Sequence, residues 1–376
     1  MKKTAVCFVL IITVFTTSCN TSRTTATFSG NDASVALEAF HETFFDKTRG
    51  IYHAKSDKSG IAAIWTQAIY WDMAMNAYKR TKSAKHKQMV DDIYAGNKSH
   101  YASFDWDNGK VWFIYDDIMW WIISLARGYE VFGNQEYLDY AESGFERVWV
   151  GSPVVKDPGS YDPVRGGMYW QWIQKDPPNR PANDGKMACI NYPTVIAAMT
   201  LYNATGKTEY LDKATEIYTW AQANLFNRET GEVADSRHGN NPTWRAHLYN
   251  QGTCIGAAMM MYKKTRKQQY LDDAALATDY VKNAMSTDRL LPFENGIEQG
   301  IYGAIFAQYI IRLIEDGNKP EYTEWMRANI NAGWSNRDTN RNITYKDVSI
   351  PCPTDIVEVY DASTCPALMQ VIKPGK

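Results

Sequence analysis

The sequence predicts an all-α protein, and two observations support this fold class. Apolar residues recur at three- and four-residue spacings through most of the chain, as they do in amphipathic helices. Three segments, 128–142, 201–218 and 261–280, also place a tyrosine eight residues before a Tyr-Leu-Asp triplet, with a short polar turn between. This recurrence indicates a repeated unit in which one helix ends, a turn follows and a second helix begins.

The helical hairpins are predicted to pack as pairs of an inner and an outer helix. The first helix of a pair is crowded with apolar and small residues, as at 255–262, whereas the second carries a charged stripe, as at 270–284. A helix that is apolar all round is buried, and one with a polar stripe faces water. Six such pairs close into an (α/α)6 barrel, a toroid of helical hairpins, and an open α-solenoid is the alternative.

Eleven helices follow from this periodicity, with ends defined to within a few residues. The three repeats mark the turns near 133–135, 205–207 and 265–267, and the other helices are assigned from amphipathic spacing alone. In chain order they are predicted at 33–47, 61–80, 85–101, 116–132, 136–149, 189–204, 208–225, 247–264, 268–284, 298–315 and 320–333. Six pairs require a twelfth helix, which the spacing does not reveal.

The long connections are predicted to carry the functional site. In a closed ring of hairpins the loops that lead into the inner helices converge on one face, and long loops are where binding and catalytic residues concentrate. These loops are 102–115, 150–188, 226–246 and 285–297. The second of them contains the aromatic run Arg-Gly-Gly-Met-Tyr-Trp-Gln-Trp.

The N-terminal residues resemble a bacterial export signal. Two lysines precede an apolar run, 5–15, that is too short to span a bilayer, and small residues directly precede Cys19. We interpret 1–18 as a lipoprotein signal peptide with Cys19 as the lipidated residue; an ordinary signal peptide with a free cysteine is the alternative. Residues 19–32, rich in Ser, Thr and Asn, are predicted to be a flexible tether, and 33–376 a single domain with a Pro-rich C-terminal tail.

Composition narrows the classes of partner. The formal net charge of −2 gives no reason to expect nucleic acid or an anionic membrane surface, so contact with a membrane is expected only through the lipid. No Cys-x-x-Cys or His-Glu-x-x-His motif occurs, and neither a metal nor a cofactor is expected. The 13 Trp and 24 Tyr suit both a core and a sugar-binding cleft, and composition does not decide between them.

Four cysteines lie beyond the signal segment. Cys189 and Cys254 fall inside apolar helical patterns, where a buried thiol is expected to behave as a small hydrophobe. Cys352 and Cys365 flank the Pro-rich segment, and a disulfide between them is one option in an oxidising compartment.

Two carboxylates stand side by side in the segment Tyr-Asp-Asp-Ile-Met-Trp-Trp, residues 115–121. Acidic residues in a first helical turn commonly satisfy free amides and complement the helix dipole, which is the structural alternative for Asp116 and Asp117. Here each also has a tryptophan one turn on, Trp120 and Trp121, which capping does not require. Retaining glycoside hydrolysis needs two nearby carboxyl groups of unequal proton affinity, and desolvation with mutual repulsion would supply that inequality.

At these residues the sequence resembles glycoside hydrolase family 76, the endo-α-1,6-mannanases, whose known members have (α/α)6 barrels. The likeness extends over most of the chain. Besides 115–121 it rests on the segments 64–78, 166–172, 186–198, 230–236, 249–258 and 334–338. A departure occurs at Gln299, where the family pattern leads us to expect a lysine, and this concerns the distal subsites more than the chemistry.

The resemblance implies a retaining, endo-acting α-1,6-mannanase that hydrolyses the mannan backbone of fungal-type glycans. Asp116 would be the nucleophile, Asp117 the acid/base, and Asp235 a hydrogen-bond partner of a mannose hydroxyl. The further candidates for contact with the α-mannan substrate are Trp65, Gln67, Trp120, Trp170, Trp172, Asn191, Tyr192, Asn250 and Gln251. We expect a monomer held in the cell envelope, on the periplasmic side of the outer membrane because no acidic run follows Cys19.

Two other functions fit parts of the pattern. A non-catalytic glycan-binding lipoprotein would keep the aromatic residues but lose at least one essential carboxylate, and both are present. Another (α/α)6 enzyme, such as an unsaturated glucuronyl hydrolase or uronate lyase, predicts cationic groups or histidines that face an acidic substrate. The candidates for that chemistry are Arg237, His238 and the segment 245–247.

Overall fold

The computed structural model describes residues 27–172 and 185–375, and these form twelve α-helices. The helices are α1 Gly30–Phe44, α2 Ile64–Thr81, α3 Ala84–His100, α4 Tyr115–Phe132, α5 Gln135–Val150, α6 Ala188–Thr205, α7 Thr208–Asn224, α8 Leu248–Thr265, α9 Gln268–Tyr280, α10 Tyr302–Glu315, α11 Thr323–Ser335 and α12 Thr364–Val371. All eleven predicted helices are present, with ends shifted by a few residues.

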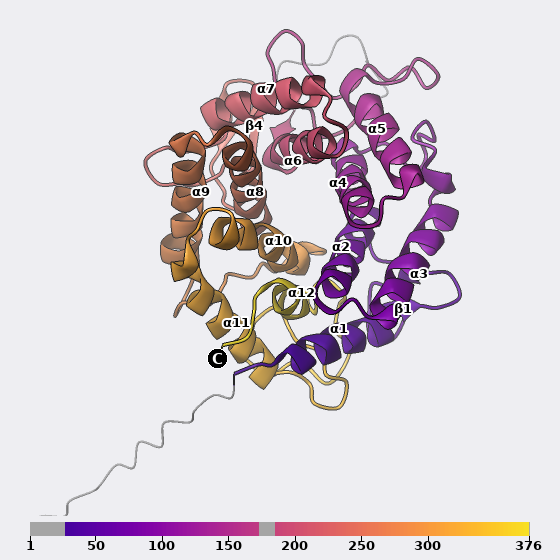
Figure 1. The fold of residues 1–376 in the computed structure, drawn as a ribbon, viewed down its shortest axis with the longest axis vertical. Helices are drawn as coiled ribbons and strands as arrows, with labels where there is room; N and C mark the ends of the chain where they lie inside the picture. The colour runs from indigo at the N-terminus through magenta and orange to yellow at the C-terminus, as the bar shows by residue number, and fades with distance from the viewer. Residues whose placement is uncertain (1–26, 173–184, 376) are drawn as a thin grey trace, which may run out of the picture.

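The even-numbered helices form an inner ring, and the odd-numbered helices surround it (Figure 1). Each inner helix packs against the next, and α12 packs against α2, so the ring closes. This closure confirms the (α/α)6 barrel and excludes the open solenoid. The inner helices are buried nearly all round, as in α6 and α8, whereas the outer helices bury one side only.

The twelfth helix lies in the segment that we interpreted as a Pro-rich tail. α12 has eight residues, seven of them buried, and it packs between α10 and α2. Pro366 falls in its first turn, where a missing backbone N–H costs no hydrogen bond. A helix of two turns is too short to show an amphipathic period, which is why the spacing did not reveal it.

The fold begins earlier than the predicted tether boundary at residue 32. Ser29 and Asp32 form a reciprocal capping box at the start of α1, with Ser29 Oγ accepting from Asp32 N at 3.1 Å. Phe28 is buried in the core, and its N–H donates to Asn331 Oδ1 at 2.9 Å. The proposed signal peptide, Cys19 and the tether as far as residue 26 lie outside the described residues.

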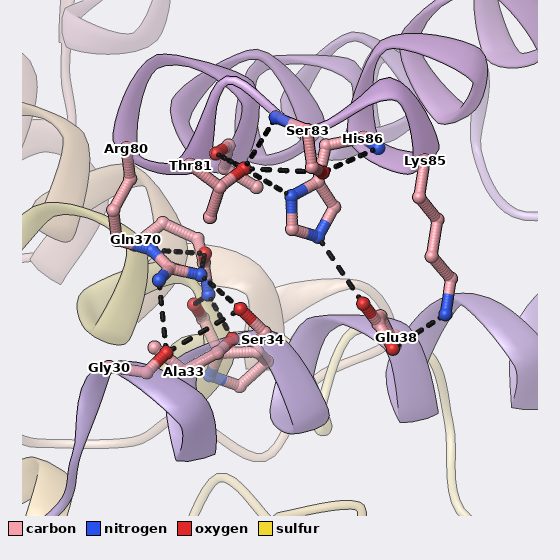
Figure 2. A network of polar contacts seen from close by, with 12 residues as sticks. Gly30, Ala33, Ser34, Glu38, Arg80, Thr81, Ser83, Lys85, His86 and Gln370 are labelled. Carbon is pink, nitrogen blue, oxygen red and sulfur yellow. Dashed lines mark hydrogen bonds and ion pairs between the residues drawn. The ribbon is translucent and has the colours of Figure 1, made fainter.

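A polar network joins the first helices of the chain to the last (Figure 2). The Arg80 guanidinium on α2 donates to Gly30 O at 3.0 Å, Ser34 Oγ at 2.9 Å and Gln370 Oε1 at 2.9 Å. Gln370 Nε2 on α12 donates in turn to Ala33 O at 2.7 Å. The network therefore fixes α1, α2 and α12 together at the point where the ring closes.

The four long loops precede α4, α6, α8 and α10, as predicted, and so gather at the N-terminal ends of the inner helices. Short strands join the loops before α6 and α8, and another pair of strands lies in the connection before α2. β3 Lys186–Met187, β4 Ser236–His238 and β5 Asn241–Thr243 form an antiparallel sheet, while β1 Phe45–Asp46 pairs with β2 Ile51–Tyr52.

The described cysteines, Cys189, Cys254, Cys352 and Cys365, are all buried free thiols, so Cys352 and Cys365 do not form the disulfide considered above. No helix within the described ranges is long and apolar enough to cross a membrane.

The turns at the opposite end of the barrel all use a left-handed residue. α4 and α6 end at Gly133 and Gly206, with φ of 68° and 72°, but α2 and α8 end at Lys82 and Arg266, with φ of 55° and 59°. A side chain makes this conformation costly, and glycine does not. We expect Arg266→Gly to raise the free energy of unfolding by about 1 kcal/mol in urea titrations.

The matched change Lys264→Gly, inside α8, is expected to lower the same free energy by about 1 kcal/mol. Equal effects of the two changes would show that the left-handed backbone at Arg266 carries no strain.

Candidate active site

Asp116 and Asp117 lie in the first turn of α4, at the loop end of the barrel. The tryptophans one turn on are both buried, and Trp121 Nε1 donates to Ile64 O at 3.0 Å, which fixes α4 against the start of α2. Tyr115 N donates to Trp170 O at 3.0 Å, so the long loop before α6 passes beside the pair. Both residues are partly exposed, although Asp116 Oδ1 itself is buried.

The two carboxyl groups differ in proton affinity. Burial raises the pKa of Asp116 to about 7, although the Cys189 thiol, the Trp170 indole and the first-turn amides of α4 favour its ionised form. Burial raises the pKa of Asp117 well above its usual range, and repulsion from Asp116 and Glu298 raises it further. Asp117 therefore keeps its proton while Asp116 ionises first, so one helix start holds both an acid and a carboxylate.

This burial makes the stability of the fold depend on pH. Between pH 3.8, the pKa of an exposed aspartate, and about 7, the folded protein binds more protons at Asp116 than the unfolded chain does. Stability therefore falls as pH rises through this window. We expect Asp116→Asn to raise the free energy of unfolding by about 2 kcal/mol at pH 8 and to change it little at pH 4. Urea titrations at the two pH values measure this, and a gain independent of pH would contradict it.

Glu298 is a third carboxylate beside the pair, and sequence reasoning missed it. Its carboxylate accepts from Trp65 Nε1 at 2.8 Å, and Trp65 packs on Trp120 with ring centroids 5.8 Å apart. Glu298 has a φ of 69°, a conformation that costs a non-glycine residue free energy. The available signal was its place directly after the loop 285–297, next to the anomalous Gln299.

Asp235 belongs to a second polar cluster on the same face. His247 Nε2 lies 3.7 Å from Asp235 Oδ1, and His247 Nδ1 lies 2.5 Å from Glu294 Oε2. His247 is the residue before α8 and is buried between the two carboxylates. The imidazole therefore holds the orientation of Asp235, which remains partly exposed.

Tyr249 and Tyr302 connect the two carboxylate groups. Their rings stack with centroids 4.0 Å apart and an interplanar angle of 18°. After burial, the charges of Asp116 and Asp235 are among the causes that raise the pKa of Tyr249 above its usual range, which places both carboxylates around one phenol. Tyr249, stacked on Tyr302, is thus near both carboxylates.

Three of the predicted substrate-contact residues are buried and hydrogen-bonded to loop backbone. Gln67, Asn191 and Gln251 are fully buried, and their amides bind the backbone of neighbouring loops. Gln67 pairs with both backbone groups of Tyr52, at 2.9 and 3.0 Å. The Asn191 amide accepts from Met168 N at 2.9 Å and donates to Met168 O at 3.1 Å. Gln251 Oε1 accepts from Val233 N at 2.6 Å. The amides of these residues therefore hold the backbone of the loops in place.

Three further candidates also lie inside the protein. Tyr192 is fully buried, with its hydroxyl beside Cys254, and Asn250 is fully buried on α8. Trp172 is 8% exposed and packs beside the Arg147 guanidinium of α5, 5.9 Å from its ring. The structure thus brings Trp65, Trp170 and Asp235 to the face of Asp116 and Asp117, with Trp120 buried beneath Trp65.

The site is lined by carboxylates and aromatic rings. Arg237, proposed for recognition of an acidic substrate, is bound to Gly239 O at 2.9 Å and to Asn224 instead. No group of three or more His, Cys, Asp or Glu among the described residues is arranged to hold a metal ion. Such a surface suits a neutral polyhydroxylated ligand, whose hydroxyls donate to carboxylates while its apolar faces lie on aromatic rings.

Comparisons with known proteins agree with this architecture. The model of Glycosyl hydrolase family 76 matches residues 29–361. The GH76A alpha-1,6-mannanase from Salegentibacter sp. HEL1_6 matches with a TM-score of 0.79 at 23% identity, over 91% of this chain and 98% of that chain. An inactive variant of that enzyme, with two consecutive aspartates replaced by asparagine, in complex with alpha-1,6-mannotriose, matches with the same values.

A family 76 glycoside hydrolase (mannosidase) from Bacteroides thetaiotaomicron VPI-5482 matches with a TM-score of 0.75 at 19% identity, over 91% of this chain and 96% of that chain. At these identities the likeness establishes the fold. No curated protein sequence matches the chain.

Proposed function

This chain belongs to glycosyl hydrolase family 76, and from that premise we propose that it is a retaining, endo-acting α-1,6-mannanase. The observation that carries the proposal is the pair of adjacent carboxyl groups on α4, which differ in proton affinity on a face lined by aromatic residues. Retaining glycosidases require one carboxylate to attack and one carboxylic acid to protonate the leaving group. Asp116 and Asp117 supply these two states at neutral pH.

In the first step the Asp117 carboxyl donates its proton to the glycosidic oxygen as a carboxylate oxygen of Asp116 attacks the anomeric carbon. The bond between the anomeric carbon and the glycosidic oxygen breaks, and a mannosyl ester of Asp116 forms. In the second step the Asp117 carboxylate takes a proton from water, whose oxygen attacks the anomeric carbon. The ester bond breaks, so Asp116 returns as a carboxylate and Asp117 regains its proton.

The acidic lining supports a neutral glycan as the substrate. In this proposal Asp235, Glu294 and Glu298 accept hydrogen bonds from sugar hydroxyls. Trp65 and Trp170 contact the apolar face of a pyranose ring. A uronic acid polymer would meet carboxylates here, which disfavours a glucuronyl hydrolase or uronate lyase. An α-1,6-mannan substrate is supported by the Salegentibacter enzyme, a structural neighbour crystallised with alpha-1,6-mannotriose.

Product analysis on linear α-1,6-mannan tests the proposal. We expect oligosaccharides of several lengths early in the digest, since cleavage is internal, and an α-anomer as the first product in proton NMR. Release of mannose alone would exclude the endo action, and an initial β-anomer would exclude the retaining mechanism. Mannan binding without any product would favour the glycan-binding alternative.

We propose further that a lipid on Cys19 anchors the protein to the cell envelope, on the periplasmic side of the outer membrane. In cells fed a labelled fatty acid, the full chain is expected to take up the label and Cys19→Ala to lose it. Protease added to intact cells is expected to leave the protein whole. Digestion in intact cells would place it on the cell surface instead.

A further inference from the structure

A large cavity opens at the end of the barrel opposite to Asp116 and Asp117. Its volume is about 1060 Å³, and it is lined by the C-terminal portions of all six inner helices. Arg127, which reaches the cavity from the same helix, is ten positions after Asp117, or about 15 Å along the axis. The layer between contains the buried ion pair of Arg127 with Asp72, at 2.6 Å. The cavity is therefore separate from the catalytic face.

The lining of this cavity is strongly cationic. Eight of the residues that line it are Lys or Arg, and three are Asp or Glu. The whole chain, by contrast, has a formal net charge of −2. Cations at helix C-termini complement the dipoles of those helices, and this explains part of the excess.

Four of the eight cations have hydrogen-bond or ion-pair partners, one of them Arg127 in its pair with Asp72. Arg80 is held by the network of Figure 2. Lys263 lies 3.0 Å from Asp316, and Lys373 lies 3.7 Å from Glu315. These ion pairs and hydrogen bonds need no ligand to explain them.

Lys82 and Lys264 lie over the rings of Tyr78 and Tyr202. Arg312 and Lys79 are different, because among the described residues neither has a hydrogen-bond partner, an ion-pair partner or a ring contact. Burial lowers the pKa of the Arg312 guanidinium, and the adjacent Arg127 lowers it further. Burial lowers the pKa of the Lys79 ammonium, and the charges of Arg127 and Arg312 lower it further. Glu130 also lines the cavity and offsets part of this charge. Arg312 is partly buried beside the buried Arg127, and Lys79 is exposed on the same cavity wall. An anion bound between them would offset the repulsion of these like charges.

We propose that this cavity binds a multiply charged oxyanion of the phosphate class, with Arg312 and Lys79 as its principal ligands. A guanidinium presents parallel N–H donors that match two oxygens of a phosphate group, and an ammonium adds a point charge. A cavity of this size accommodates a phosphorylated small molecule. The same chemistry would recognise the head group of an anionic phospholipid. The inference does not depend on the proposed function, because it concerns the other end of the barrel.

Titration calorimetry with pyrophosphate at low salt tests the proposal. We expect wild-type protein to bind one equivalent, Arg312→Gln to bind at least about tenfold more weakly, and Lys79→Gln several-fold more weakly. The control is Lys267→Gln, which removes an exposed positive charge in the turn after α8, outside the cavity lining, and is expected to leave the affinity unchanged. Since Lys79 is exposed within the cavity, its variant keeps the test valid should Arg312→Gln fail to fold.

Sedimentation with vesicles of phosphatidylglycerol, compared with vesicles of phosphatidylcholine, separates the two sources of phosphate. Binding to pyrophosphate alone identifies a soluble ligand, and binding to phosphatidylglycerol that is lost in Arg312→Gln identifies a lipid head group. Absence of binding to both probes would overturn the proposal. Equal binding by Arg312→Gln and Lys267→Gln would overturn it as well, because the attraction would then be general charge. Hydrolysis of mannan is expected to be unaffected by Lys79→Gln, so this result is independent of the proposed mechanism.

Discussion

Asp116→Ala is expected to lower kcat on α-1,6-mannan by roughly 10⁵-fold, because no other group is placed to form the mannosyl ester. The effect should be the same for substrates with good and poor leaving groups, since the attacking atom itself is missing. Initial rates of reducing-end release measure the loss. The fold is expected to survive, because Asp116 is a partly exposed residue in a first helical turn and its Oδ1 has no hydrogen-bond partner among the described residues.

Asp212→Ala is the matched control for this loss. Asp212 is an exposed aspartate on the outer helix α7, and its removal is expected to leave kcat unchanged. Azide added to Asp116→Ala is expected to restore turnover of an activated aryl α-mannoside and to produce β-mannosyl azide, since the anion enters the space left by the carboxylate. An α-mannosyl azide, or residual mannanase activity near the wild-type rate, would assign the nucleophile to another residue.

The loss of rate in Asp117→Ala is expected to depend on the leaving group of the substrate. On mannan, whose leaving alcohol needs a proton, kcat should fall by roughly 10³–10⁴-fold. On an aryl mannoside with an acidic phenol, formation of the mannosyl ester should proceed at a rate within about tenfold of wild type, because that leaving group departs without general acid help. The ester then accumulates, since no base activates water, and it is detectable by intact-mass spectrometry on Asp116.

The pH profile provides a second measurement for the same variant. Wild-type kcat/KM should fall below about pH 7 as Asp116 takes a proton, and should fall again at higher pH as Asp117 loses its own. In Asp117→Ala the fall at high pH should disappear, while Asp212→Ala should keep both limbs. Loss of the low-pH limb instead would reverse the assigned roles. Equal losses on mannan and on the aryl mannoside would show that Asp117 acts in binding.

Much of the architecture can be predicted from the sequence. Helix periodicity is a local property, so the helices, the three repeated hairpins and the inner and outer character of their members could be read from spacing. The four long loops followed from the same assignment. Residues adjacent in the chain are neighbours in any fold. If one of Asp116 and Asp117 belongs to a site, the other therefore lies beside that site.

The tertiary structure decided what depends on residues distant in the chain. Gln67, Asn191 and Gln251 lie at the starts of inner helices, where an amide can face either the barrel axis or a loop backbone, and sequence spacing is the same for both. Only the packed loops show that their hydrogen-bonding capacity is used by backbone groups. Glu298 likewise lies near Asp117 only because the closed ring brings the segment before α10 to the start of α2, where Trp65 donates to Glu298.

The inequality between the two acids is also a tertiary property. Asp116 and Asp117 have the same chemistry and adjacent positions, but Cys189, Trp170 and the helix amides favour the ionised form of one, while Glu298 disfavours ionisation of the other. By itself, the sequence determined that the chain forms a ring of helical hairpins with a pair of carboxyl groups on α4, because both follow from local order. Which carboxyl keeps its proton, and which side chains surround the pair, was decided by the closed barrel, because desolvation and charge act through space between residues far apart in the chain.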